Sequence, residues 1–270
     1  MSVINAVLLG VIQGLTEFLP ISSSGHLVLF QKIFGIEEPA LLFDTLLHVG
    51  TLVAVFVVLW KDIWAILRKL NQPLTAYLII ATVPTVLCAL AFRKPLEKMF
   101  ATGEFLGVCF LITSALLVMA ELLSRRAVGR LKKAGEMNLL DALAIGIMQA
   151  VALIPGVSRS GATLSGALSR RLNRDFAARF SFMLSIPAIL GAAVFQLKDL
   201  PKGGEAAMSG GGIGTAAIIA GTLASAVVGF FAVRLMLKIV REKSLWSFAV
   251  YTGILGILVL ADQHITHLVF

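Results

Sequence analysis

Charged residues are scarce in this chain: they make up 14% of its 270 residues, against about a quarter in soluble domains. Hydrophobic residues make up 58%. A soluble domain would leave most of these apolar stretches with nothing to pack against, so the composition excludes that class. It predicts an all-α protein that crosses a membrane several times.

Cysteine is nearly absent as well, and neither Cys88 nor Cys109 has the spacing of a metal site. Both lie in apolar runs, so we interpret them as small core residues that say nothing about the redox compartment. The first segment lacks a basic region and a small-residue cleavage site, so we expect Met1–Leu19 to be retained rather than removed as a signal peptide. The net charge of +8 predicts no nucleic-acid partner, because the basic residues cluster at the ends of apolar segments, where they indicate membrane orientation.

Long apolar runs are what the sequence has in abundance, and about six can cross roughly 30 Å of hydrocarbon. They are residues 42–60, 74–92, 104–124, 180–197, 212–237 and 246–262. Two further apolar segments, 3–30 and 139–165, are broken by Pro20 or Pro155 and then by serine and glycine. Irregular backbone is tolerated inside a membrane only where protein buries it or it lines a cavity. These two segments are therefore predicted to be re-entrant helical hairpins.

The two broken segments match each other. Gly10–Leu27 reads GVIQGLTEFLPISSSGHL, and Gly146–Thr163 reads GIMQAVALIPGVSRSGAT, at a constant offset of 136 residues. Since this offset is about half the chain, we predict a duplication, with a first repeat at 1–135 and a second at 136–270 that together form one membrane domain.

The basic residues give the predicted orientation. Most of them lie in four loops, residues 61–72, 125–138, 166–179 and 238–245, which the positive-inside rule places in the cytoplasm. The first hairpin then enters from the outer side and the second from the cytoplasmic side, so the repeats have opposite topology. Inverted repeats bring their broken elements together near the middle of the membrane, where we expect a shared site. The glycine-rich stretch 198–214 is predicted to be a flexible external connection.

Polar residues gather at the first break. Gln13 and Glu17 are four residues apart and share one face of a helix. Glu17 is either part of a site or a lone glutamate near the membrane surface. Three hydroxyls and an imidazole follow, in Ser22, Ser23, Ser24 and His26. The backbone N–H groups of such a turn can form a nest for an anion, although serine also commonly caps the next helix, which would use only one hydroxyl.

Arg159 is the charged residue of the second break, in the run PGVSRSG. A guanidinium so deep in apolar sequence needs an anionic partner, and its planar fork suits phosphate oxygens. The alternative is an Arg159–Glu17 ion pair that only locks the hairpins together. Asp44 and His48 begin another apolar segment, and either support the site from a second layer or mark the membrane–water boundary.

Together these residues suit phosphate chemistry, because a hydroxyl can attack, a carboxylate or imidazole can move a proton, and a guanidinium can stabilise charge. A site inside the membrane predicts an amphipathic substrate, and a lipid phosphate or diphosphate fits best. The competing interpretation is a transporter or flippase for such a lipid, since broken helices in inverted repeats are typical of secondary transporters. The serine–histidine cluster favours an enzyme, because a carrier needs no nucleophile beside a proton acceptor.

Several stretches match the motifs of a known family: Gln13–Glu17, Pro20–His26, Pro155–Thr163 and, less distinctively, Asn173–Phe182. Through them the chain resembles, over essentially its whole length, the undecaprenyl-diphosphate phosphatases of the bacitracin-resistance type. The resemblance implies an enzyme of the bacterial plasma membrane whose site faces the outer side and that hydrolyses undecaprenyl diphosphate. The monophosphate is then reused as the carrier for peptidoglycan, which links the activity to bacitracin resistance. The resemblance also implies dependence on a divalent cation, Mg²⁺ or Ca²⁺.

On this resemblance, Ser23 attacks the terminal phosphorus and Glu17 or His26 takes its proton. Arg159 stabilises the developing charge. Attack by His26, or by an activated water, stays open. Glu17 and Gln13 bind the cation, although a glutamine at the first position weakens the idea of two carboxylate ligands.

The residues expected to contact the substrate are Ser22, Ser24, Ser158, Ser160 and Thr163. Membrane lipids are expected partners. A homodimer is compatible with the sequence, which does not fix the oligomeric state.

Overall fold

The structure is a computed structural model that describes residues 1–36, 41–126, 130–199 and 213–270. Most of the predicted external connection at 198–214 falls outside these ranges. The described residues form helices joined by short loops, and their one β-type contact is an isolated bridge between Lys132 and Leu172.

Five helices are long and apolar enough to cross a membrane, and a bent pair of helices reaches the length of a sixth crossing only when the two are counted together. The five are α5 (Pro73–Ala91), α7 (Leu106–Arg126), α10 (Arg174–Asp199), α12 (Thr215–Glu242) and α13 (Trp246–Ala261). The pair consists of α3 (Leu41–Val58) and α4 (Trp60–Arg68), which meet at 79°. Each of the six predicted segments is largely helical where it is described, and five of them lie in uninterrupted candidate spans. The prediction of an all-α protein with several membrane-spanning helices is confirmed.

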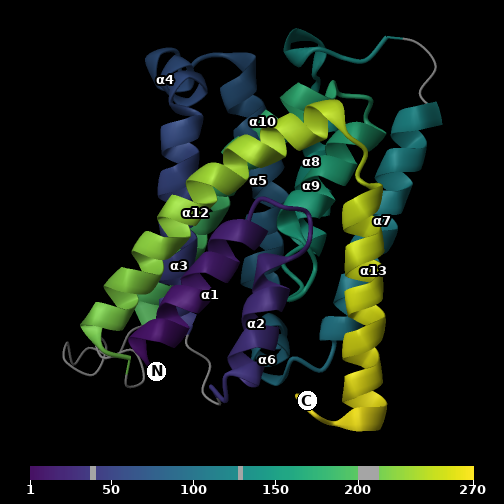
Figure 1. Ribbon diagram of the computed structural model, residues 1–270. Coiled ribbons are helices and arrows are strands. Elements are labelled where there is room, and N and C mark those ends of the chain that lie inside the picture. Colours follow the sequence, from purple (N-terminus) through teal and green to yellow (C-terminus); the bar gives the residue numbers. More distant parts are fainter. Residues whose placement is uncertain (37–40, 127–129, 200–212) are drawn as a thin grey trace.

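Four shorter helices carry the two broken segments. They are α1 (Val3–Thr16), α2 (Ser23–Ile33), α8 (Leu139–Val151) and α9 (Arg159–Ser169). α1 and α8 are apolar, but at 14 and 13 residues each measures only about 20 Å, which is too short to span a bilayer. In Figure 1, the chain enters the α1–α2 hairpin at the lower end of the molecule, whereas α8 and α9 lie toward the upper end. That each hairpin re-enters a bilayer, and that the repeats are inverted, stay predictions.

The hairpins pack into opposite halves of the chain: α1 lies along α12, and α8 lies along α5. Matching glycines make both contacts close. A Cβ atom on Gly10 would overlap the carbonyl group of Gly221, and one on Gly146 would overlap that of Ala81. Because each half buries a helix of the other, the described residues pack as one unit.

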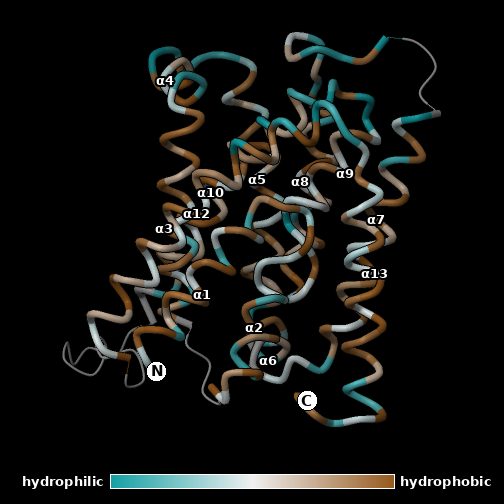
Figure 2. Tube along the Cα trace, viewed as in Figure 1, coloured by the Kyte–Doolittle hydropathy of each residue, from teal (hydrophilic) through white to brown (hydrophobic). Residues whose placement is uncertain are grey.

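The ends of the molecule differ in charge. α4, the short η1 helix (Ala134–Glu136) and the C-terminal end of α12 lie at one end, and α6 (Arg93–Thr102) and η2 (Asp262–Thr266) lie at the other (Figure 1). Figure 2 shows polar residues concentrated at the first end. Two buried carboxylates form ion pairs there. Asp141 pairs with Lys132 and Arg170, and Glu121 pairs with Arg125 and Arg174, at 2.7–3.0 Å. This is the end that the positive-inside rule assigns to the cytoplasm.

Candidate functional site

Glu17 is the centre of a polar cluster where the two hairpins meet. It directly follows α1 and is buried. Its Oε1 atom accepts a hydrogen bond from Arg159 Nη2 at 2.8 Å. Its Oε2 atom accepts from Ser23 Oγ at 2.6 Å and from Gln13 Nε2 at 2.9 Å. The structure therefore brings four of the predicted site residues into direct contact, and Arg159 comes from the other half of the chain.

The turn between α1 and α2 aims Ser23 at this carboxylate. Ser22 has φ 72° and ψ 92°, a region that residues other than glycine rarely adopt and that costs on the order of 1–3 kcal/mol. Its hydroxyl accepts a hydrogen bond from the Gly25 N–H at 3.2 Å. Ser22 is thus the N-cap of α2, as the simpler interpretation of the serines predicted, and Ser23 begins the helix with its hydroxyl on Glu17.

Arg159 occupies the matching position in the second hairpin, at the first residue of α9. Ser158 caps this helix through a 3.0 Å bond from the Gly161 N–H. The guanidinium also donates from Nη1 to the carbonyl oxygen of Ser181 in α10, at 3.4 Å. The Arg159–Glu17 ion pair that the sequence left open is therefore present, and it joins the two hairpins.

Ser24 and Ser160, which match each other in the repeat, each reach across to the opposite hairpin. Ser24 Oγ accepts from the Gly156 N–H at 3.4 Å, and Ser160 Oγ donates to the Leu19 carbonyl oxygen at 3.0 Å. These hydroxyls hold the two turns together around Glu17. Their predicted contact with substrate stays a prediction.

Ser158 and Thr163 also have protein partners. The Ser158 N–H donates to Thr113 Oγ1 at 3.0 Å, and the Thr163 and Ser181 hydroxyls lie 2.6 Å apart. Since Ser181 also accepts from Arg159, these residues fix α9 against α7 and α10. Their contact with substrate is likewise untested.

Both ring nitrogens of His26 are bonded to groups other than the Ser23 hydroxyl. Its Nδ1 atom lies 2.7 Å from the Ser22 carbonyl oxygen, so this nitrogen carries a hydrogen, and Nε2 lies 2.8 Å from the Tyr251 hydroxyl. The Tyr251 ring stacks on the imidazole, with centroids 5.8 Å apart. Of the two proton acceptors that the sequence left open, Glu17 is therefore the one in contact with Ser23. Sequence reasoning missed Tyr251, whose signal was a phenol hydroxyl inside a largely apolar crossing.

His48 joins the cluster from α3. Its Nε2 atom is 3.4 Å from Glu17 Oε2, and its Nδ1 atom is 2.7 Å from the Asp44 carbonyl oxygen. The Asp44 carboxylate accepts from Gln31 Nε2 of α2 at 2.6 Å. The His48 side chain is more exposed than the other two, at 26% against 16% for Arg159 and 4% for Glu17. The sequence left two roles open for His48, support of the site or a position at the membrane–water boundary. Its contact with Glu17 favours support of the site.

An oxygen atom is available for a cation beside Glu17. Gln13 Oε1 is buried, and it has no hydrogen-bond partner in the described part of the chain. Amide and carboxylate oxygens suit Mg²⁺ and Ca²⁺. Among the described residues there is no group of three His, Cys, Asp or Glu side chains that could hold a metal. A cation bound to Gln13 and Glu17 would thus need water or substrate oxygens to complete its shell, which Mg²⁺ sites commonly use.

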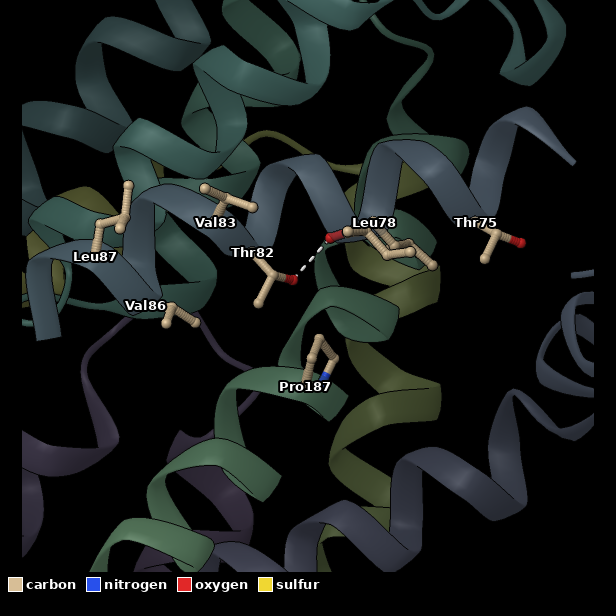
Figure 3. Close-up of a pocket in the computed structure, with 8 residues that line it drawn as sticks. Thr75, Leu78, Thr82, Val83, Val86, Leu87 and Pro187 are labelled. Carbon is tan, nitrogen blue, oxygen red and sulfur yellow. Dashed lines mark hydrogen bonds between the residues drawn. The ribbon is translucent and has the colours of Figure 1, made fainter. Parts of the chain in front are cut away.

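A surface groove lies elsewhere, between α5 and α10. Figure 3 shows its walls, which Leu78, Val83, Leu87 and Pro187 dominate. The Thr82 hydroxyl donates to the Leu78 carbonyl oxygen at 2.7 Å. The described residues that line this groove carry no charge, so they cannot neutralise a phosphate, and the cluster around Glu17 is the better candidate site.

Comparison with known proteins gives consistent matches over nearly the whole chain. Residues 6–258 match the family described as bacitracin resistance protein BacA. An undecaprenyl-diphosphatase of Carboxydothermus hydrogenoformans is 47% identical over 97% of this chain and 98% of its own length. Undecaprenyl-diphosphatase 4 of Bacillus thuringiensis subsp. konkukian is 42% identical over the same shares. An undecaprenyl-diphosphatase of Methanosphaera stadtmanae is 37% identical over 96% of this chain and 97% of its own.

Proposed function

We propose a function for this chain from the family to which it belongs, that of the bacitracin resistance protein BacA: it hydrolyses undecaprenyl diphosphate to undecaprenyl phosphate and inorganic phosphate. The names of its relatives support the reaction. The single observation that carries the chemistry is the 2.6 Å hydrogen bond from the Ser23 hydroxyl to Glu17, whose other oxygen pairs with Arg159. A hydroxyl, a carboxylate and a guanidinium in contact are the parts that phosphoryl transfer needs.

In the proposed mechanism, Glu17 accepts the Ser23 proton as the serine oxygen bonds to the terminal phosphorus. The bond from that phosphorus to the bridging oxygen breaks, and undecaprenyl phosphate leaves. Water then attacks the phosphorus of the phosphoserine and the bond from phosphorus to Ser23 Oγ breaks. Glu17 returns its proton to Oγ, the hydroxyl of the water stays on the released phosphate, and the second proton of the water passes to solvent. Arg159 stabilises the charge on the phosphoryl oxygens, and its five N–H donors leave groups free for this beyond its bonds to Glu17 and Ser181.

A divalent cation fits this proposal as a second source of positive charge. When bound, Mg²⁺ or Ca²⁺ would neutralise the diphosphate. Gln13 Oε1 and the Glu17 carboxylate are the residues that would hold it, since the first is buried without a partner and the second is beside it.

The proposed location is the bacterial plasma membrane, with the site facing the outer side. The hairpin that carries Glu17 and Ser23 starts at the end of the molecule opposite the basic loops (Figure 1). If those loops are cytoplasmic, this hairpin enters from outside. The product would then be recycled as the lipid carrier for peptidoglycan, and continued recycling would give bacitracin resistance. No observation here favours the transporter alternative.

The decisive experiment measures phosphate release from undecaprenyl diphosphate by the purified protein, with and without EDTA. Ser23→Ala, Glu17→Gln and Arg159→Ala are compared with the wild type, and Ser209→Ala, outside the cluster's sequence motifs, is the control. We expect cation-dependent release in the wild type and a loss of about a hundredfold or more in each cluster variant. No release by folded wild-type protein would overturn the phosphatase proposal. Full activity in Ser23→Ala alone would instead assign the attack to water or to His26.

A further inference from the structure

α4 is a short helix set almost at a right angle to α3. The chain turns at Leu59, and the nine residues of α4 then run at 79° to the preceding helix. α4 lies at the basic end of the molecule, at the upper left of Figure 1. Because α3 is part of a membrane crossing, a helix at this angle lies along the membrane surface rather than through it.

α4 has separate faces for protein and for lipid. Ile63 is buried and Ile66 packs against the main core. Trp60, Trp64 and Leu67 are spaced at i, i+4 and i+7, so they share a different face, and all three are exposed. A large exposed apolar face on a helix at the membrane boundary is typical of interfacial helices.

The two tryptophans form an ordered pair at this face. Their rings stack at 5.3 Å between centroids and 19° between planes. The Arg68 guanidinium lies over the Trp64 ring at 5.0 Å. Tryptophan favours the headgroup level of a bilayer, so this pair sets the depth of α4 and places Arg68 among the headgroups.

The positive charges of α4 have no acidic partner among the residues that the structure describes. Within the described ranges, no carboxylate forms an ion pair with Lys61, Arg68 or Lys69, which are exposed. The one acid on α4, Asp62, is engaged by Arg179 of α10 at 2.9 Å. That ion pair anchors α4 to the body of the protein and leaves its basic residues uncompensated.

We propose that α4 is a binding surface for anionic phospholipid headgroups. Trp60, Trp64 and Leu67 contact the acyl chains just below the headgroups, and Lys61 and Arg68 pair with the lipid phosphates. Lys61 and Arg68 are seven residues apart and share one face, next to the tryptophan face. The acyl chains of an anionic lipid therefore meet the apolar side chains of α4, and its phosphate meets the basic ones.

Tryptophan quenching by brominated lipids tests this surface. The full-length protein, with Trp246→Phe in every sample so that only Trp60 and Trp64 report, is placed in vesicles containing acyl-brominated phosphatidylglycerol or acyl-brominated phosphatidylcholine. We expect the wild-type surface to be quenched by both lipids, with an apparent affinity about fivefold or more higher for phosphatidylglycerol, since one basic residue near an anionic surface contributes about that factor.

Charge-removing variants distinguish lipid binding at α4 from a general attraction between a basic protein and anionic lipid. Lys61→Gln/Arg68→Gln is expected to abolish the preference. Lys94→Gln/Lys98→Gln, which removes the same charge from exposed positions of α6 at the other end, is expected to keep it. Equal affinity for the two lipids in the wild type, or equal loss in both variants, would overturn the proposal. So would the absence of quenching, because α4 would then lie outside the membrane interface.

Discussion

At the scale of single residues, the Glu17 carboxylate is held by partners from four helices, and His48 is its contact from α3. Replacing His48 with leucine removes the 3.4 Å contact to Glu17. We expect kcat to fall about tenfold, or about 1.4 kcal/mol in the activation barrier, with little change in KM, because Glu17 loses its support from α3. His48→Gln can present an amide nitrogen near the same point and should retain most of the activity. Steady-state phosphate release measures both.

A matched control for this prediction exists in the same chain. His264 also contacts the carbonyl oxygen four residues before it, at 3.0 Å, but it is exposed in the C-terminal region. His264→Leu should leave kcat unchanged. If His48→Leu were as active as His264→Leu, His48 would have no part in positioning Glu17.

His26 and Tyr251 give a second residue-scale prediction. Since both ring nitrogens of His26 are bonded away from Ser23, we expect its role to be the attachment of α2 to α13. Tyr251→Phe should lower the free energy of unfolding by about 1 kcal/mol and leave activity within about threefold of wild type. Thermal unfolding and phosphate release are measured together, with Tyr77→Phe as the control. A Tyr251→Phe protein that is stable but inactive would instead implicate the His26–Tyr251 pair in proton transfer.

At the scale of helices, the matching glycines Gly10 and Gly146 set how closely the two halves approach. A Cβ atom at either position would meet backbone of the facing helix, so the helices must separate. Overpacking of this kind costs about 1–3 kcal/mol, which should exceed the gain in helix propensity of about 1 kcal/mol. We expect Gly10→Ala and Gly146→Ala to lower the Tm in detergent. Gly191→Ala in α10, where a Cβ atom meets nothing within 4 Å, should raise it slightly.

The sequence could predict these helices but not their partners. Apolar length predicted the crossings, and the constant offset predicted which glycines and serines correspond. Both can be read directly from the order of residues in the chain. That α1 lies along α12, and α8 along α5, depends on side-chain fit between distant segments. For the same reason Glu17, Ser23 and Arg159 could be proposed together from two motifs, whereas the contacts of His48 and Tyr251 needed the fold. The left-handed φ of Ser22 was not predicted either, since no glycine marks it.

At the scale of the whole molecule, the inverted topology is itself a prediction, and it requires both ends of each hairpin to lie on the same side of the membrane. Ile4 and Ile33 lie at the two ends of the first hairpin, and Leu140 and Ser169 at the two ends of the second; all four are exposed. Each is replaced singly by cysteine in a protein whose native cysteines are alanine, and intact cells are treated with a membrane-impermeant maleimide. We expect labelling at Ile4 and Ile33, and labelling at Leu140 and Ser169 only after the cells are opened. Labelling of Ile4 and Ile33 from opposite sides would mean that the first segment spans the membrane, and Glu17 and Arg159 would then meet inside an ordinary helix bundle.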